Sequence, residues 1–180
     1  MIEEKLLRRL APVLRAAEDL GARVWAVGGC VRDALAGAPM SNDIDLVLES
    51  DPAELARRAA RLCGGSCEVF GRFGTVRLSL PGGALFDFAR ARGETYPHSG
   101  ALPVVRPATL AEDLRRRDFS VNAMAAEIFP ARGSLIDPFN GKEDLKSRTL
   151  RILHDASFLD DPTRLYRGAR YAARFSLRPE

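Results

Sequence analysis

Hydrophobic residues recur at helical spacing over residues 2–20, and this pattern ends at Gly21, a residue suited to a helix C-terminus. The continuous apolar run RVWAV (23–27) predicts a buried strand. GGCVRDALAG follows it and predicts a turn that leads into a short helix. IDLVL (44–48) predicts a second strand, and residues 52–65 predict a helix with proline at its start and glycines at its end.

Further along the chain, three more strands are predicted near 67–70, 74–80 and 84–91, the last two joined by PGG. Residues 92–108 show no clean period and carry Gly, Pro and Ser, which predicts a long functional or mobile loop. The order of strands and helices indicates an α+β domain with a mixed β-sheet, followed by a helical segment.

Local signals mark two later helices. Thr109 and Glu112 form a T-x-x-E capping box, which predicts a helix through about residue 116. IDPFNGKEDL reads as turn-rich. The last helix is predicted to begin with Asp161 as its N-cap and Pro162 in its first turn, and to run toward the C-terminus.

Composition narrows the class of protein. The chain has 180 residues, of which 46% are hydrophobic and 28% charged, as in a soluble globular protein of one domain with the start of a second. No apolar run approaches the ~20 residues that span a bilayer. The N-terminus lacks a signal-peptide cleavage pattern, so a cytoplasmic location without membrane contact is expected. Cys63 and Cys67 have no second Cys/His pair to complete a zinc site, which favours buried or incidental thiols.

The basic residues are 24 Arg and three Lys, with a net charge of +3. Arginine binds phosphates bidentately and stacks on bases, although a GC-rich genome or a hot environment explains the same bias equally well. Residues 146–180 hold eight Arg or Lys against four Asp or Glu. Polyanion binding is therefore expected near the C-terminal end.

The first candidate site combines a glycine turn with an Asp-x-Asp strand. Side chains alternate along a strand, so Asp43 and Asp45 share one face. Two adjacent carboxylates are costly unless a cation binds them, and hard oxygen ligands suit Mg²⁺ held together with substrate phosphates. Gly28 and Gly29 would let the backbone approach a triphosphate at a helix N-terminus, with Arg32 one turn inside.

Each of these features alone is commonly a turn or a surface feature, but their order favours function. A dinucleotide-binding oxidoreductase fits less well, because G-x-G-x-x-G is absent. Asp87, in LFDFAR, is either a third carboxylate facing the metal or a solvent-facing strand residue, and the sequence leaves both readings open.

Two arginine-rich stretches follow. In RRRDFSVNA, Arg117 and its neighbours before Asp118 form either a solvated basic patch or a site for a triphosphate or ribose. In the last helix one face is predicted to carry an arginine comb: Arg164, Arg167, Arg170 and Arg174. The other face is predicted to pack: Leu165, Tyr166, Ala169, Ala172 and Ala173. The comb contains no acid after Asp161, which favours nucleotide or RNA binding over a solvated face.

Three stretches together resemble the class II tRNA nucleotidyltransferase and bacterial poly(A) polymerase family of the polymerase-β-like superfamily. VGGCVRDALAG with NDIDL is similar to its first signature, and RRRDFSVNAMA to its second. LIDPFNGKEDLKSRTLRIL and DDPTRLYRGARYAARF are similar to its neck-entry and base-reading segments. The resemblance runs from about residue 23 to 176. It implies a catalytic head over residues 1–138 and the start of a helical neck over 139–180.

The resemblance also implies site roles and partners. It implies that Asp43 and Asp45 hold two Mg²⁺ ions, and that nucleotide-binding residues fill the rest of the site: Gly28, Gly29, Arg32, Arg117, Asp161, Arg164, Arg167 and Arg170. Asp161 and Arg164 would read the incoming base. The implied activity is addition of C, A or both from CTP and ATP to the 3′ end of tRNA.

Two departures and several alternatives qualify that expectation. The base-reading motif usually begins Glu-Asp, whereas here it is Asp160-Asp161. The chain ends at Glu180, partway through the expected neck, so it is expected to bind nucleotide yet to fail in extending tRNA. The motifs do not separate full CCA addition, CC-only or A-only addition, and poly(A) tailing. A non-catalytic RNA- or nucleotide-binding module is the rival from a different class.

Overall fold

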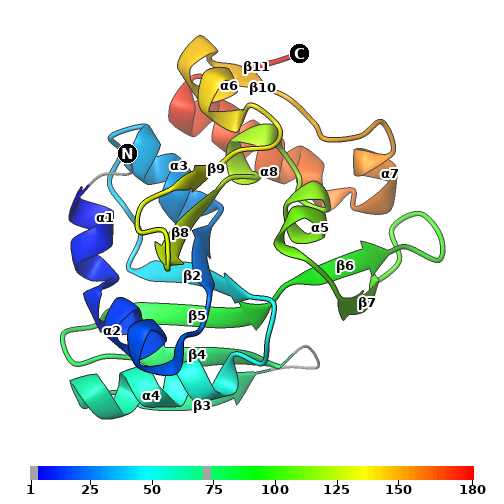
Figure 1. Ribbon diagram of the computed structural model, residues 1–180. Coiled ribbons are helices and arrows are strands. Elements are labelled where there is room, and N and C mark those ends of the chain that lie inside the picture. The colour runs from blue at the N-terminus through cyan, green and yellow to red at the C-terminus, as the bar shows by residue number, and fades with distance from the viewer. Residues whose placement is uncertain (1–3, 71–73) are drawn as a thin grey trace.

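A mixed seven-stranded sheet in the order β3-β4-β5-β2-β1-β8-β9 forms the centre of the protein (Figure 1). The computed structural model describes residues 4–70 and 74–180, with residues 4 and 5 described by their backbone alone. The pair β2–β5 is parallel, and the other neighbouring pairs are antiparallel. The strands are β1 (Val24–Val27), β2 (Asp43–Leu48), β3 (Ser66–Phe70), β4 (Thr75–Ser79), β5 (Leu85–Arg90), β8 (Ala125–Phe129) and β9 (Leu135–Ile136). The predicted α+β class with a mixed sheet is confirmed.

Helices cover both faces of this sheet, but one face is covered more fully than the other. The larger core lies under four helices: α1 (Glu4–Arg9), α2 (Ala11–Leu20), α3 (Gly29–Leu35) and α4 (Ala53–Cys63). On the other face α5 (Leu110–Arg115) covers a smaller cluster around Trp25 and Val27. Because β1 is covered on both faces, all four of its residues are buried, which explains its continuous apolar run. The rest of this second face is open around the start of β2.

The N-terminal segment is two helices where the sequence predicts one. Pro12 lies in the first turn of α2, where a missing backbone N–H costs nothing, and a new helix begins there. Gly21 ends α2 in the left-handed conformation, with φ of 60°, as predicted. Residues 2 and 3 of the predicted helix lie outside the described residues.

The prediction of a loop over residues 92–108 is wrong, because the two ends of this stretch form paired strands. Arg92–Thr95 (β6) and Val104–Pro107 (β7) form an antiparallel two-stranded sheet. Pro97 and Pro103, which obscure the strand pattern in the sequence, both fall in the connection between the strands. This β6–β7 hairpin reaches toward the C-terminal segment. There the backbone N–H of Gly100 donates to the carbonyl of Leu159 at 3.0 Å, and the Ser99 hydroxyl donates to the same oxygen at 2.7 Å.

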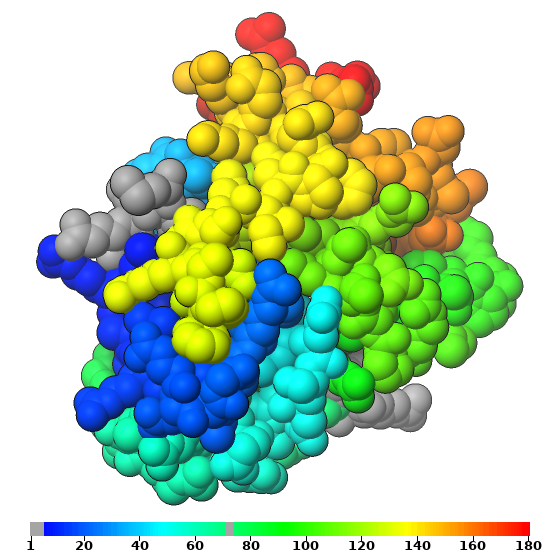
Figure 2. Space-filling model, viewed as in Figure 1, coloured from blue at the N-terminus to red at the C-terminus, as the bar shows by residue number. Residues whose placement is uncertain are grey.

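Beyond β9 the chain forms a helical segment that packs on the sheet domain. It contains α6 (Gly141–Ser147), α7 (Ser157–Asp160) and α8 (Thr163–Phe175), with the short strands β10 (Thr149–Leu150) and β11 (Arg178–Pro179) paired in parallel. Phe119, just before the 3₁₀ turn η1 (Ser120–Asn122), and Val121 within that turn join its core. Figure 2 shows this segment, in yellow-orange to red, at the upper end of the molecule. A boundary between residues 138 and 139 stays a prediction.

The turn-rich stretch IDPFNGKEDL leads into α6, which the sequence analysis did not predict. The Asp137 carboxylate accepts the backbone N–H groups of Gly141 at 2.7 Å and Lys142 at 2.9 Å, and so caps the new helix. Position 141 must be glycine, because a Cβ there would clash with the carbonyl oxygen of Ser120 at 2.1 Å. The predicted capping box of Thr109 and Glu112 is present at the start of α5.

The prediction of which face of α8 packs is wrong for all its residues except Ala172, which is partly buried against the core of the C-terminal segment. Leu165 is 56% exposed and Tyr166 83% exposed, whereas Arg164, Gly168 and Tyr171 are buried. Gly168 explains the rotation of the helix, because it lets α8 approach Phe119 so closely that a Cβ would lie 2.9 Å from that ring. The arginine side of the helix therefore faces the sheet domain. No helix among the described residues is long and apolar enough to cross a membrane.

Candidate active site

An open cleft of about 1110 Å³ lies between the sheet and the C-terminal segment. Its walls come from the ends of β1, β2 and β5, the glycine turn, the β6–β7 hairpin, the end of α5 and the start of α8. All but one of the predicted site residues line it: Gly28, Gly29, Arg32, Asp45, Arg117, Asp161, Arg164, Arg167 and Arg170, with the possible third carboxylate Asp87. Asp43 is exposed at the start of β2, outside this lining.

The glycine turn is required by its neighbours as well as by its backbone. Gly28 has φ of 70° and ψ of −123°, a conformation that L side chains rarely adopt. A Cβ at Gly28 would also lie 2.6 Å from Nη1 of Arg117. The turn thus brings the N-terminal end of α3 and the second signature together at the floor of the cleft.

Strand register explains where the carboxylates lie. In β2 the side chains of Ile44 and Leu46 enter the core while Asp43 and Asp45 are exposed, as predicted from alternation. Asp45 is in register with Asp87 on the parallel neighbour β5. The carboxyl groups therefore form a short row on the open face of the sheet.

The carboxyl group of Asp45 is electrostatically crowded. Solvent reaches the Asp45 side chain, but the surrounding cleft removes part of the hydration of its carboxyl group. This desolvation raises its pKa, Arg117 lowers it, and Asp87 and Asp43 raise it further. This is the environment that a bound cation relieves. Among the described residues, no group of three or more His, Cys, Asp or Glu side chains is arranged to hold a metal ion. Asp43 and Asp45 share one face of β2, and paired carboxylates of this kind are suited to Mg²⁺ that is held together with substrate oxygens.

Asp87 is occupied by an ion pair. Arg77, in register with it on β4, donates from Nε to Oδ1 at 2.7 Å and from Nη2 to Oδ2 at 2.6 Å. This bidentate pair is absent from the sequence-based reasoning, because the two residues lie on different strands, ten positions apart. Asp87 lines the cleft, yet both of its oxygens are engaged by a guanidinium.

The second signature is organised by a buried acid that the sequence analysis did not identify. Asp113 is fully buried, and its carboxylate accepts Nη2 of Arg116 at 2.7 Å and Nη2 of Arg117 at 2.9 Å. Burial alone would raise the pKa of Asp113, but these two guanidinium groups outweigh it and the net pKa is lowered. Arg115 is exposed. The three consecutive arginines, alike in the sequence, therefore differ in role.

Arg32 forms part of the wall and is held in place. It is 3% exposed, donates to Asp33 at 2.9 and 2.6 Å and to the Asn122 side-chain oxygen, and lies over the rings of Tyr171 and Phe175. Its predicted contact with phosphates stays a prediction. The network it belongs to links α3 to α8.

Asp118 continues this network across the cleft. One carboxylate oxygen accepts the Asn122 side-chain N–H at 3.0 Å, and the other accepts Nε of Arg167 at 2.7 Å. No partner for Asp118 was predicted from the sequence. Its position after three arginines and four residues before Asn122 was the available signal, but the partner on α8 lies 49 residues away.

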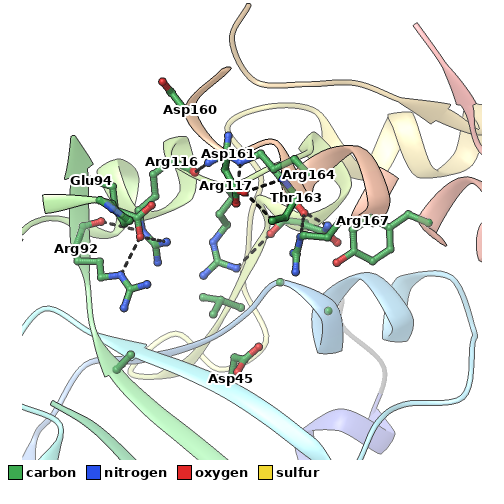
Figure 3. A pocket seen from close by; sticks show the side chains of 18 of the residues that line it. Asp45, Arg92, Glu94, Arg116, Arg117, Asp160, Asp161, Thr163, Arg164 and Arg167 are labelled. Carbon is green, nitrogen blue, oxygen red and sulfur yellow. Dashed lines mark hydrogen bonds and ion pairs between the residues drawn. The ribbon is translucent and has the colours of Figure 1, made fainter. Parts of the chain in front are cut away.

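Asp161 and Arg164 lie across the cleft from Asp45 (Figure 3). The Asp161 carboxylate accepts the backbone N–H of Thr163 at 2.9 Å and its hydroxyl at 2.6 Å, so it caps α8 although the backbone places the cap one residue later. Arg164 is 4% exposed and donates to the Ser157 hydroxyl at 2.7 Å and to the carbonyl of Arg116 at 2.9 Å.

The cleft therefore presents two chemically different walls. In Figure 3, Asp45 lies on the sheet side, and Arg117, Arg164 and Arg167 lie across from it. Carboxylates on one side suit a metal ion, and guanidinium groups on the other suit phosphates and base edges. A ligand that carries phosphates, a metal ion and a base would match both walls.

The chain belongs to the family described as Poly A polymerase head domain, which it matches over residues 24–151. Among its relatives is the A-adding tRNA nucleotidyltransferase of Halalkalibacterium halodurans, 42% identical over 177 residues, or 98% of this chain and 40% of the relative. The A-adding enzyme of Aquifex aeolicus is 46% identical over 87% of this chain and 19% of that protein. The CC-adding enzyme of Deinococcus radiodurans is 42% identical over 85% of this chain and 41% of that protein.

Solved structures agree with this assignment. A CCA-adding enzyme in an apo form superposes with a TM-score of 0.89 at 40% identity, covering 99% of this chain and 42% of that chain. A tRNA nucleotidyltransferase complexed with a primer tRNA and an incoming ATP analogue gives a TM-score of 0.81 at 41% identity, covering 93% of this chain and 46% of that one. The chain thus spans less than half the length of these relatives.

Proposed function

We propose that the protein is a template-independent nucleotidyltransferase that adds C, A or both from CTP or ATP to the 3′ end of tRNA. The observation that carries the proposal is the pairing of the two walls, with Asp43 and Asp45 on the sheet opposite the fixed Asp161 and Arg164. The relatives' names and the tRNA complex of a similar structure support the same reaction class. A tRNA substrate is consistent with a cytoplasmic location.

In this mechanism Asp43 and Asp45 would hold two Mg²⁺ ions together with the substrate phosphates. When bound, the ions would lower the pKa of the RNA 3′-hydroxyl and stabilise the leaving pyrophosphate. Gly28 and Gly29 allow the triphosphate to approach the backbone, and Arg117 offsets its charge.

The base would be read at the other wall. Arg164 uses two of its five N–H groups on Ser157 and Arg116, so others remain to donate to a base edge, and the Asp161 carboxylate is available as an acceptor. Arg167 and Arg170 extend this wall along α8 and complete the nucleotide site. A base read by fixed protein groups needs no nucleic-acid template.

The test is extension of tRNA transcripts that end at the discriminator base, at C or at CC, resolved to single nucleotides. Each transcript receives CTP or ATP with Mg²⁺, and Asp43→Ala is the inactive control. Ordered addition that stops at CCA, CC or A and is lost in Asp43→Ala would establish the proposed reaction and its kind. Long A tails on any RNA would make the protein a poly(A) polymerase.

The segment of the Halalkalibacterium halodurans enzyme that matches this chain is the size-matched control, because this chain spans 40% of that relative. If that segment extends tRNA and this chain does not, the proposed activity is wrong. If neither extends tRNA, binding of ATP with Mg²⁺ is measured by calorimetry. Weaker ATP binding in both Asp45→Asn and Arg164→Met would then support the proposed site. Unchanged ATP binding would favour the alternative, a non-catalytic binding module.

A further inference from the structure

The side chains of three adjacent strands form a row beside the candidate metal site. Asp45 on β2 is in register with Asp87 on β5, which is in register with Arg77 on β4. Neighbouring strands are ~4.8 Å apart, so Arg77 lies two strand spacings from Asp45 on the same face of the sheet. A positive charge is therefore built into the row that would receive a divalent cation.

Arg77 neutralises the carboxylate that would otherwise be the third ligand. Its guanidinium contacts both oxygens of Asp87, and the pair is partly shielded, with side-chain exposures of 40% and 21%. The ring of Phe70 lies 5.5 Å from the guanidinium and restricts its movement. The pair thus has the geometry of a fixed bidentate contact, in contrast to a mobile surface ion pair.

We propose that Arg77 is a resident counter-ion of the metal site that keeps the free protein's affinity for divalent cations low by occupying Asp87. Asp43 and Asp45 alone then offer too few ligands for tight binding. Oxygen ligands from a nucleotide's phosphates complete the shell, so the cation arrives together with the nucleotide. This inference rests on the proposed metal-dependent function, and it assigns Arg77 a positioning role outside the reacting groups.

The experiment measures Mn²⁺ affinity by electron paramagnetic resonance, with and without ATP, because Mn²⁺ takes the same oxygen ligands as Mg²⁺. The variants are Arg77→Met, Asp87→Asn and the double variant, with circular dichroism to verify folding. Arg77→Met should bind Mn²⁺ about tenfold more tightly without ATP, since a unit charge is removed and a carboxylate is released near the site. The gain should be smaller with ATP present.

The double variant separates the two causes of that gain. If the released Asp87 becomes a ligand, Asp87→Asn should reverse most of the gain of Arg77→Met. If removal of charge alone were responsible, the double variant would keep the gain, and the assignment of Asp87 as the occupied ligand would be wrong.

Arg58→Met is the matched control, because it removes the same charge from another partly exposed Arg–Asp pair, in which both donors contact the single oxygen Oδ2 of Asp19. Arg58 donates to Asp19 at 2.9 and 2.5 Å, with similar side-chain exposures of 38% and 35%, and lies on α4 under the other face of the sheet. It should leave Mn²⁺ affinity within twofold of the wild-type value. Equal affinities in Arg77→Met, Arg58→Met and wild type would overturn the inference.

Arg77→Lys keeps the proposal testable if Arg77→Met does not fold. A lysine keeps the charge but cannot make the bidentate contact, so its Mn²⁺ affinity should lie between those of the wild type and a charge-removed protein. Failure of the proposed function gives a different result. In that case neither the wild type nor any variant binds Mn²⁺ in an Asp45-dependent way, even with ATP.

Discussion

At the scale of single residues, Asp45 shows how function and stability oppose each other in this protein. Its carboxyl group lies in a partly buried cleft beside two other carboxylates, and its pKa is raised by burial first and by Asp87 and Asp43 next. An acid whose folded-state pKa lies above its unfolded value destabilises the fold when it is ionised at neutral pH. Such a residue is unfavourable for folding and suits a cation site.

Asp45→Asn should therefore abolish activity without loss of stability. Under the proposed function, nucleotide incorporation should fall at least ~10³-fold, because the proposed metal ligand is lost. The melting temperature at pH 7 should equal or exceed that of the wild type. Thermal unfolding followed across pH checks the second part: the difference should shrink as the pH falls through the raised pKa of Asp45, where the wild-type carboxyl group also becomes neutral. A lower melting temperature at pH 7 would contradict this account.

At the scale of elements, helix α8 is oriented by its contacts and not by its hydrophobic pattern. A helical wheel places Tyr166 on the apolar side and Arg164 on the polar side, yet the structure exposes the tyrosine and buries the arginine. Arg164 is accommodated because Ser157 and the Arg116 carbonyl accept its N–H groups. Hydrogen-bond partners supplied by other elements thus outweigh simple amphipathicity.

Two tyrosines on this helix provide a matched test of its orientation. Tyr171 is 7% exposed and packs edge-on against Phe119, with ring centroids 6.0 Å apart, whereas Tyr166 is 83% exposed. Tyr171→Ser should lower the free energy of unfolding by ~2–4 kcal/mol, as for a buried aromatic side chain. Tyr166→Ser should change it by less than ~0.5 kcal/mol. Urea unfolding of both variants measures this, and equal losses would mean that α8 packs through the opposite face.

At the scale of the whole molecule, arginines of α8 line the cleft, and two of them are paired with acids, Arg167 with Asp118 and Arg174 with Asp33. The net charge is only +3, so the protein as a whole attracts polyanions weakly. Arg167, Arg170 and Arg174 nevertheless line one wall of the cleft along α8. RNA affinity is therefore expected to depend on this wall and not on the overall charge.

The salt dependence of RNA binding tests that expectation. Arg170→Gln should weaken binding of a tRNA transcript and reduce the slope of log affinity against log salt by ~0.7–0.9, the value for one lost phosphate contact. Arg61→Gln is the control, because Arg61 lies on α4, on the other side of the sheet, and pairs with Glu54 at 3.1 Å. Fluorescence anisotropy at several salt concentrations measures both slopes. Equal slopes in the two variants would show that α8 does not contact the RNA backbone.

Features that depend only on neighbours along the chain follow from the amino-acid sequence. The alternation of a strand places Asp43 and Asp45 on one face, and the two glycines specify the turn before α3, so most of the candidate site was predictable. The capping box of Thr109 and the apolar run of β1 followed from equally local rules. Local backbone geometry is sufficient for these features, because the period of a strand or helix needs no knowledge of the fold.

Contacts between side chains of different elements depend on how the helices and strands pack. Three features depend on contacts between segments whose relative positions the sequence does not reveal. They are the ion pair of Arg77 with Asp87, the packing of α8 and the pairing of β6 with β7. Each arginine in this chain looks alike in the sequence, yet burial and partners differ among them. The physical reason is that charge and hydrogen-bond energies depend on distance and solvent access, and these are set only when the sheet and the C-terminal segment pack together.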